Sequence, residues 1–333
     1  MVGPLSEREK ALPGRQGWLF LQGDTNDVIG QHTGRVRLGR EARREWKALL
    51  EARVAWMREF GIPWVCQIAP DKESVYPEYL PPEIVPSRRR PVHELLRAAR
   101  SLKPPMTYPL QELVAAKGDW PLYFPTDTHW TQRGAYVAYL ALCQELEGRG
   151  LRPLVVRDET VSWVKQSHYG DLGSKLDPPV EGPGLAAQLE HHSSRLVFDN
   201  RIENHGRVMI FEQDRPAEPS CVAFGESFTN QLLLFLKESF RRLVFVHTSM
   251  MIREVVMREA PDVVISLPLE RFLIRVPDDR NALATLTDTI ERKLARGDLR
   301  DFPGMYLRGC PSPGAVALER QLGTSPWQPT ETG

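Results

Sequence analysis

The carboxyl-terminal half of the sequence alternates short apolar runs with amphipathic runs, and this alternation most constrains the fold. The apolar runs have the length of buried strands, and the amphipathic runs have the spacing of helices with one apolar face. The predicted strands are Ser220–Phe224, Arg242–Val246 and Asp262–Ser266, and the predicted helices are Thr229–Glu238, Met250–Glu259 and Arg280–Arg296. Strands that alternate with helices form a parallel sheet covered on both faces, so we expect a three-layer α/β/α fold.

The amino-terminal half fits the same scheme with longer connections. We predict helices at about Gly39–Phe60, Val92–Leu102 and Gln132–Glu147, strands at Ile62–Ala69 and Tyr123–Phe124, and a proline-rich loop at Pro70–Pro91. Residues 151–205 contain many turn-forming residues and predict an irregular insertion with short strands such as Val161–Val164. One domain is expected over residues 14–300, after a lead-in of residues 1–13 and before a proline-rich tail of residues 301–333.

Charge and motif content exclude several functional classes. The 43 basic residues balance 43 acidic residues, which gives no general attraction to nucleic acid or to an anionic membrane. No run of about 18 apolar residues predicts a transmembrane helix, and the amino terminus lacks an export signal. Cys66, Cys143, Cys221 and Cys310 form no paired motif, which predicts reduced thiols and a cytoplasmic protein. We expect no metal and no cofactor, because zinc-ligand spacing and phosphate-binding glycine motifs are absent.

One serine occupies a position suited to nucleophilic catalysis. The strand that ends at Phe224 runs into Gly225-Glu226-Ser227, and a predicted helix follows. A serine between a buried strand and a helix points into the crevice where α/β sheets bind ligands. Backbone amides at that helix start can stabilise an oxyanion. By itself, the pattern is explained more often by a serine that caps the helix.

A base for this serine is offered by Asp127-Thr128-His129-Trp130, just before the helix predicted at Gln132. A carboxylate two residues from an imidazole can bind one ring nitrogen and leave the other free for a serine hydroxyl. Helix capping by Asp127 or Thr131 is the alternative. Together with Ser227, these residues predict a catalytic triad.

Other candidate site residues have weaker support. Lys72 and Tyr76 follow the strand that ends at Ala69 and are expected to border the same crevice, unless they are an ordinary loop lysine and a packed tyrosine. Asn26 is a candidate second oxyanion donor, with turn formation as the alternative. His168 and His247 are possible pocket residues, His191-His192 fits a solvated surface, and Tyr169–Gly173 fits a substrate loop or a tight turn.

The sequence resembles the alginate O-acetyltransferase (AlgX/AlgJ-like) branch of the SGNH hydrolase superfamily. The matching stretches are Gly14–Leu21, Ile68–Lys72 with Val75–Pro77, Asp127–Trp130, Gly225–Phe228 and Pro261–Ile265 with Glu270–Arg271. In ordinary SGNH hydrolases the serine comes first, whereas here the Asp-x-His motif precedes it, as in that branch.

The resemblance implies an SGNH-like fold in a permuted order, with Ser227 as nucleophile, His129 as base and Asp127 as its orienting partner. Gly225 precedes the nucleophile by two residues, and Glu226 stands where the family usually has Asp. The implied activity is O-acylation, chiefly O-acetylation, of a carbohydrate or glycosylated metabolite. The implied partners are an acyl donor and, by analogy with the family, a membrane-bound protein that supplies it. A carbohydrate esterase with the same triad and a non-catalytic carbohydrate-binding protein are the alternatives.

Overall fold

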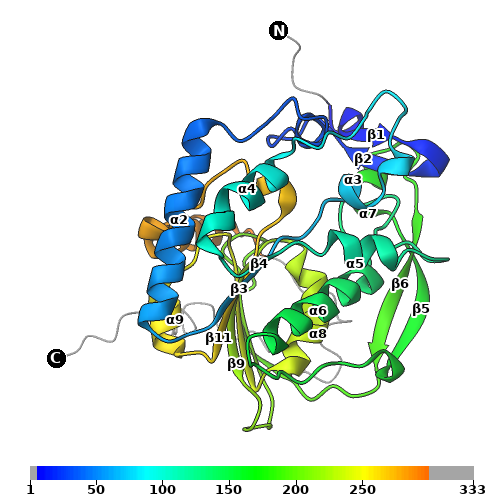
Figure 1. Ribbon diagram of the computed structural model, residues 1–333. Coiled ribbons are helices and arrows are strands. Elements are labelled where there is room, and N and C mark those ends of the chain that lie inside the picture. The colour runs from blue at the N-terminus through cyan, green and yellow to red at the C-terminus, as the bar shows by residue number, and fades with distance from the viewer. Residues whose placement is uncertain (1–5, 300–333) are drawn as a thin grey trace.

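A central sheet of seven strands organises residues 6–299, the part of the chain that the computed structural model describes (Figure 1). Its strands, in spatial order, are β4 (Met106–Thr107), β3 (Trp64–Gln67), β11 (Val263–Leu267), β9 (Ser220–Gly225), β10 (Arg242–His247), β8 (Val208–Glu212) and β7 (Arg195–Asp199). The first five strands are parallel to one another. This parallel part holds the three strands that the alternating pattern predicted.

The far edge of the sheet corrects the prediction of a purely parallel sheet. Strand β8 runs antiparallel to β10, and β7 runs antiparallel to β8. Only a short connection, residues 200–207, joins β7 to β8. Such a connection is too short for a crossover, so the two strands can pair only as a hairpin. Turn-forming residues on either side hid both strands from the sequence patterns.

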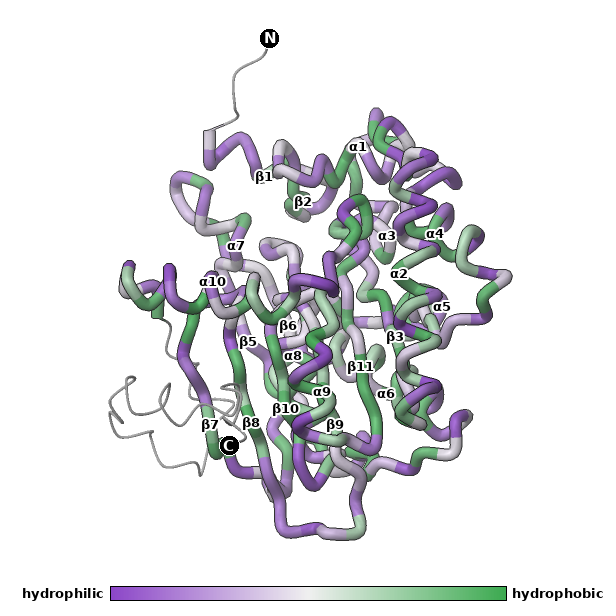
Figure 2. Tube along the Cα trace, turned by 90° about the vertical axis from the view of Figure 1, so that its left-hand side faces the viewer, coloured by the Kyte–Doolittle hydropathy of each residue, from purple (hydrophilic) through white to green (hydrophobic). Residues whose placement is uncertain are grey.

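Helices cover both faces of the sheet, which confirms the three-layer α/β/α fold. One face carries α2 (Arg40–Glu59), α4 (Pro91–Ala99), α9 (Arg253–Glu259) and α10 (Ala282–Arg296). The other face carries α5 (Leu110–Ala115), α6 (Gln132–Glu147) and α8 (Thr229–Ser239). Successive strand residues alternate between the two cores: Cys221 and Ala223 pack toward α6 and α8, whereas Val222 and Phe224 pack toward α2. Figure 2 shows the resulting hydrophobic stretches along β8, β10 and β11.

Smaller elements surround one end of the sheet. Strands β1 (Ala11–Pro13) and β2 (Leu19–Leu21) pair, so the end of the expected lead-in packs as part of the domain. Strands β5 (Val161–His168) and β6 (Gly182–Leu189) form a long antiparallel pair in the region expected to be irregular. This pair lies beside α5 and α6 (Figure 1), and the side chain of Gln132 accepts a hydrogen bond from the amide of Ala187. The short helices are α1 (Val28–His32), α3 (Lys72–Val75) and α7 (Gly170–Gly173).

Most predicted element bounds hold to within a few residues. The helix at Gln132–Glu147 is confirmed, and that at Gly39–Phe60 is one residue shorter at each end. The strand expected at Tyr123–Phe124 is wrong: Tyr123 forms one isolated bridge with Trp130. The proline-rich tail lies outside the described residues. Within residues 6–299, no helix has the length and apolar character needed to cross a membrane.

Candidate active site

Ser227 lies at the carboxyl end of β9, where the strand turns into α8. The turn is tight, because a Cβ on Gly225 would lie 2.2 Å from the Thr229 hydroxyl oxygen. Ser227 itself is only half-buried, although both of its neighbours are buried. The backbone amides of Ser227 and Phe228 donate no hydrogen bond to another described residue. The turn therefore presents a hydroxyl together with two backbone donors just ahead of a helix.

His129 and Asp127 complete a chain of hydrogen bonds to this serine. His129 Nε2 lies 2.9 Å from Ser227 Oγ, and His129 Nδ1 lies 2.6 Å from Asp127 Oδ1. The backbone amide of His129 also donates to Asp127 Oδ1, at 2.8 Å. The structure thus brings together the three residues that the sequence singled out. The capping alternative applies only to Thr131, whose hydroxyl accepts from the amide of Gly134.

The surroundings shift the pKa values of His129 and Asp127. Burial opposes the protonated form of His129, but the charge and hydrogen bond of Asp127 outweigh it, so the pKa of His129 is raised. Burial also opposes ionisation of Asp127, yet its contacts with His129 and His168 hold its pKa well below the usual range. Asp127 is therefore ionised at neutral pH and stabilises an imidazolium next to it.

Two residues outside the predicted triad hold the other oxygen of Asp127: His168, a pocket candidate from the sequence, and Asp171, in the segment predicted as a substrate loop or tight turn. His168 Nε2, at the end of β5, lies 3.2 Å from Asp127 Oδ2, and the backbone amide of Asp171 in α7 donates to the same oxygen at 2.9 Å. The Asp171 carboxylate binds the hydroxyl of Thr128 at 2.6 Å. The segment Tyr169–Gly173 thus anchors the catalytic loop, residues 124–130, which carries Asp127 and His129, and no local pattern could have revealed this contact.

Lys72 supports the catalytic loop from behind and does not border the crevice beside Ser227 as predicted. Its side chain is buried, and its ammonium group donates to the backbone oxygens of Phe124, Pro125 and Asp127 at 3.2, 3.2 and 2.6 Å. Burial lowers the pKa of Lys72 to about 8. A lysine with three carbonyl acceptors fixes backbone geometry, so the loop conformation depends on it.

Three other candidates lie around the site in different roles. The hydroxyl of Tyr76 accepts a hydrogen bond from the amide of Leu122, and Tyr76 also lines the aromatic cleft described below. Asn26 is buried, and its backbone oxygen accepts from Gln31, which donates to the backbone oxygen of Arg271 as well. Gly225 allows the tight turn because it has no side chain.

Two clusters of histidine and carboxylate groups have the spacing to hold a metal ion. One is Asp127, His129 and Asp171, and the other is His32, Asp71 and Glu270. In the first cluster, the close contact between His129 and Asp127 suits a shared proton. In the second, Arg271 and Arg90 bind the carboxylates as cations, so the cluster is an ion-pair network. The first set of donors therefore fits the Asp127–His129 hydrogen bond better than a metal ion, and the second fits the arginine cations better.

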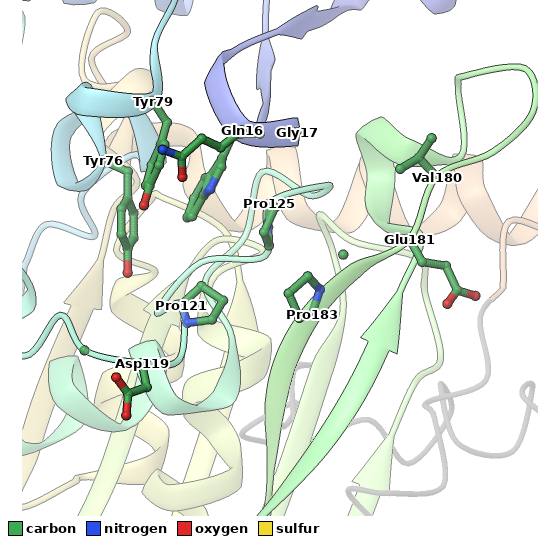
Figure 3. A pocket seen from close by; sticks show the side chains of 13 residues that line it. Gln16, Gly17, Tyr76, Tyr79, Asp119, Pro121, Pro125, Val180, Glu181 and Pro183 are labelled. Carbon is green, nitrogen blue, oxygen red and sulfur yellow. The ribbon is translucent and has the colours of Figure 1, made fainter.

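An aromatic cleft of about 390 Å³, shown in Figure 3, lies beside Pro125, which precedes Asp127 by two residues. Trp18 stacks on Tyr79 with ring centres 4.5 Å apart and also contacts Tyr76. Pro125 of the catalytic loop lines the cleft together with Asp119. Flat aromatic surface beside polar groups is typical of small-molecule sites.

These features define a three-layer α/β protein with a Ser-His-Asp triad at the carboxyl ends of its parallel strands. The sequence matches the family described as "SGNH hydrolase-like domain, acetyltransferase AlgX" over residues 11–249. The chain belongs to this family, as the resemblance noted in the sequence indicated.

Relatives with known names agree with the family. The chain is 28% identical over 184 residues to the probable alginate O-acetylase AlgJ of Pseudomonas fluorescens, covering 52% of this chain and 43% of that protein. A second AlgJ, from Pseudomonas putida, is 28% identical over 148 residues, with 43% and 36% covered. The chain spans less than half the length of these relatives.

Solved structures with low sequence identity share the fold. PatB1 of Bacillus cereus has a TM-score of 0.61 at 12% identity, with 79% of this chain and 98% of that chain covered. The O-acetyltransferase domain of Pseudomonas putida AlgJ has a TM-score of 0.51 at 19% identity, with 84% and 99% covered. The fold of this chain therefore extends over nearly the whole of both solved structures.

Proposed function

We propose that this protein is an O-acyltransferase that moves an acyl group, chiefly acetyl, to a hydroxyl of a carbohydrate through an acyl-Ser227 intermediate. The observation that carries the proposal is the unbroken chain of hydrogen bonds from Asp127 through His129 to Ser227. A serine hydroxyl is a weak nucleophile at neutral pH unless a base accepts its proton. The names of the AlgJ relatives and the family description support O-acetyl transfer in particular.

The first half-reaction forms the acyl-enzyme. Ser227 Oγ attacks the carbonyl carbon of the donor while its proton passes to His129 Nε2. The carbonyl oxygen becomes an oxyanion next to the free amides of Ser227 and Phe228. When the carbon–oxygen bond to the leaving group breaks, His129 returns the proton to that group. The charge of Asp127 stabilises the imidazolium between the two proton transfers.

The second half-reaction uses the same groups in reverse. His129 takes the proton of an acceptor hydroxyl, whose oxygen attacks the acyl carbon of Ser227. The tetrahedral intermediate collapses, the bond to Ser227 Oγ breaks, and the proton on His129 goes to Ser227. Transfer and ester hydrolysis differ only in whether a sugar hydroxyl or water is the acceptor, so the esterase alternative uses the same residues.

The test uses a chromogenic acetyl ester with and without sugar acceptors. Mass spectrometry of the quenched protein should show one acetyl group on the peptide that holds Ser227, and acceptors should speed its loss and become acetylated. Ser227→Ala should lose labelling and turnover, whereas the matched change Ser167→Ala, at an exposed serine of β5, should retain both. Hydrolysis that no acceptor alters would favour an esterase. Full function in Ser227→Ala would favour a binding protein and refute the triad mechanism.

The acceptor, the donor and the place of action are further parts of the proposal. The aromatic cleft beside Pro125 supports a saccharide acceptor, because sugar rings stack on flat aromatic side chains. A membrane-bound protein that supplies the acyl group, and a cytoplasmic location, stay predictions from the sequence.

A further inference from the structure

Arg271 lies at the same edge of the sheet as Ser227, although the two are far apart in the sequence. Strand β11 is the direct neighbour of β9, with Leu267 opposite Gly225. The chain continues past β11 into the short segment Glu270–Phe272, so Arg271 follows the carboxyl end of β11 just as Ser227 follows the carboxyl end of β9. Parallel strands bring the residues after their carboxyl ends together.

An ion pair and two aromatic rings fix the guanidinium of Arg271. The residue is 7% exposed, and Nη1 donates to Asp71 Oδ1 at 2.6 Å. Its Cζ lies 5.5 Å from the ring centre of Phe228 and 5.6 Å from that of Phe272. Phe228 directly follows Ser227, and its ring centre lies 4.9 Å from that of His129. The ring of Phe228 therefore contacts both the guanidinium of Arg271 and the imidazole of His129.

The guanidinium has hydrogen-bonding capacity that the described residues leave unused. It carries five N–H donors, yet the bond to Asp71 is the one found within residues 6–299. Arg53, which is buried elsewhere in the fold, binds both oxygens of Asp279 and the backbone oxygen of Ser249. The unused N–H groups of Arg271 are absent from the fully buried, unpartnered side-chain atoms of the described residues, so they keep accessible surface from which they can bind another group. An ion pair that only stabilised the fold would resemble that of Arg53.

We propose that Arg271 is a catalytic residue that donates hydrogen bonds to the oxyanion of the tetrahedral intermediates, together with the backbone amides of Ser227 and Phe228. The proposal rests on the function proposed above. A fixed cation next to the reacting carbonyl stabilises the charge that develops there and needs no rearrangement during the reaction. Asn26, the sequence-based candidate for this role, is linked to Arg271 through Gln31, whose side chain donates to the backbone oxygens of both residues.

The test compares Arg271→Gln, Arg271→Lys and the double variant Asp71→Asn/Arg271→Gln, which avoids an unpaired buried carboxylate. The readout is acetylation of Ser227 by an uncharged acetyl ester. We expect acylation to fall about 10²–10³-fold in Arg271→Gln with little change in KM, and to stay low in the double variant. Arg271→Lys keeps the charge but not the planar set of donors, so we expect an intermediate loss of at least about tenfold. Arg53→Gln is the control, with reduced stability but unchanged turnover per folded molecule.

A second readout separates a catalytic role from a structural one. The charged groups around His129 are Asp127, Asp171 and Arg271, and the ring of Phe228 contacts its imidazole. The positive charge of Arg271 lowers the pKa of His129, so Arg271→Gln should move the acid limb of the pH–rate profile to higher pH. Acylation restored to the wild-type rate in the double variant would overturn the proposal, since it would show only an ion-pair role. The proposal would also be overturned if Arg271→Gln changed only the KM for acidic acceptors and left acylation of Ser227 unchanged. Failure of the proposed function itself would appear differently, as wild-type protein without acetyl-Ser227.

Discussion

Replacing Asp127 with Asn tests the central hydrogen-bond chain most directly. Each carboxylate oxygen of Asp127 accepts two hydrogen bonds: Oδ1 from the ring and amide of His129, and Oδ2 from His168 and the amide of Asp171. An amide group has only one acceptor oxygen, so its NH₂ must face donors on one side. If that side is His129, the imidazole takes the wrong tautomer. In either orientation, the imidazolium loses the charge that stabilises it.

The expected loss follows from these two effects. In a serine protease triad, the same change lowers kcat about 10⁴-fold through the wrong tautomer. Because His168 and Asp171 favour one amide orientation over the other only weakly, we expect a loss of about 10³–10⁴-fold, which equals about 4–5.5 kcal/mol of transition-state stabilisation. The assay is the rate of Ser227 acetylation by a chromogenic ester, with folding checked by thermal unfolding.

A matched carboxylate serves as the control. Asp262 accepts hydrogen bonds from the amide and hydroxyl of Ser220 at the amino ends of the strands, the edge opposite the triad. Asp262→Asn should cost about 1–2 kcal/mol of stability and leave acetylation unchanged. If folded Asp127→Asn kept more than a tenth of the wild-type rate, the assignment of Asp127 as the orienting partner would be refuted.

Three further predictions concern the same site. Activity requires neutral His129, whose pKa is raised, so the rate should fall with decreasing pH with a midpoint above the ordinary value of about 6.5; a midpoint below it in a pH–rate profile would contradict the pairing with Asp127. Gly225→Ala should lower kcat and cost about 1–3 kcal/mol, and adding Thr229→Ala should recover part of both losses, as measured by kinetics and denaturant unfolding. Lys72→Met leaves three carbonyls unpaired, so it should cost about 2–4 kcal/mol and lower kcat more than KM; unchanged stability in urea would show that Lys72 does not hold the loop.

The sequence by itself determined the parallel centre of the fold and the three residues of the triad. Both are written in local patterns: apolar runs with strand length, the small turn before Ser227, and the spacing of Asp127 and His129. The contact between His129 and Ser227 could be inferred only because each residue lies in a recognisable motif just before a helix. The family resemblance added the order of these motifs, and the match over residues 11–249 agrees with it.

Tertiary structure alone decided which other residues meet the triad. His168 and Asp171 reach Asp127 from a hairpin that the sequence indicated only in part, and Lys72 turned out to lie behind the catalytic loop. Arg271 comes next to Phe228 because β11 pairs with β9 in one particular register. Sequence periodicity shows which face of an element is buried but not which strand becomes its neighbour. That choice depends on the packing of the whole sheet, so residues that act through it cannot be found from local patterns.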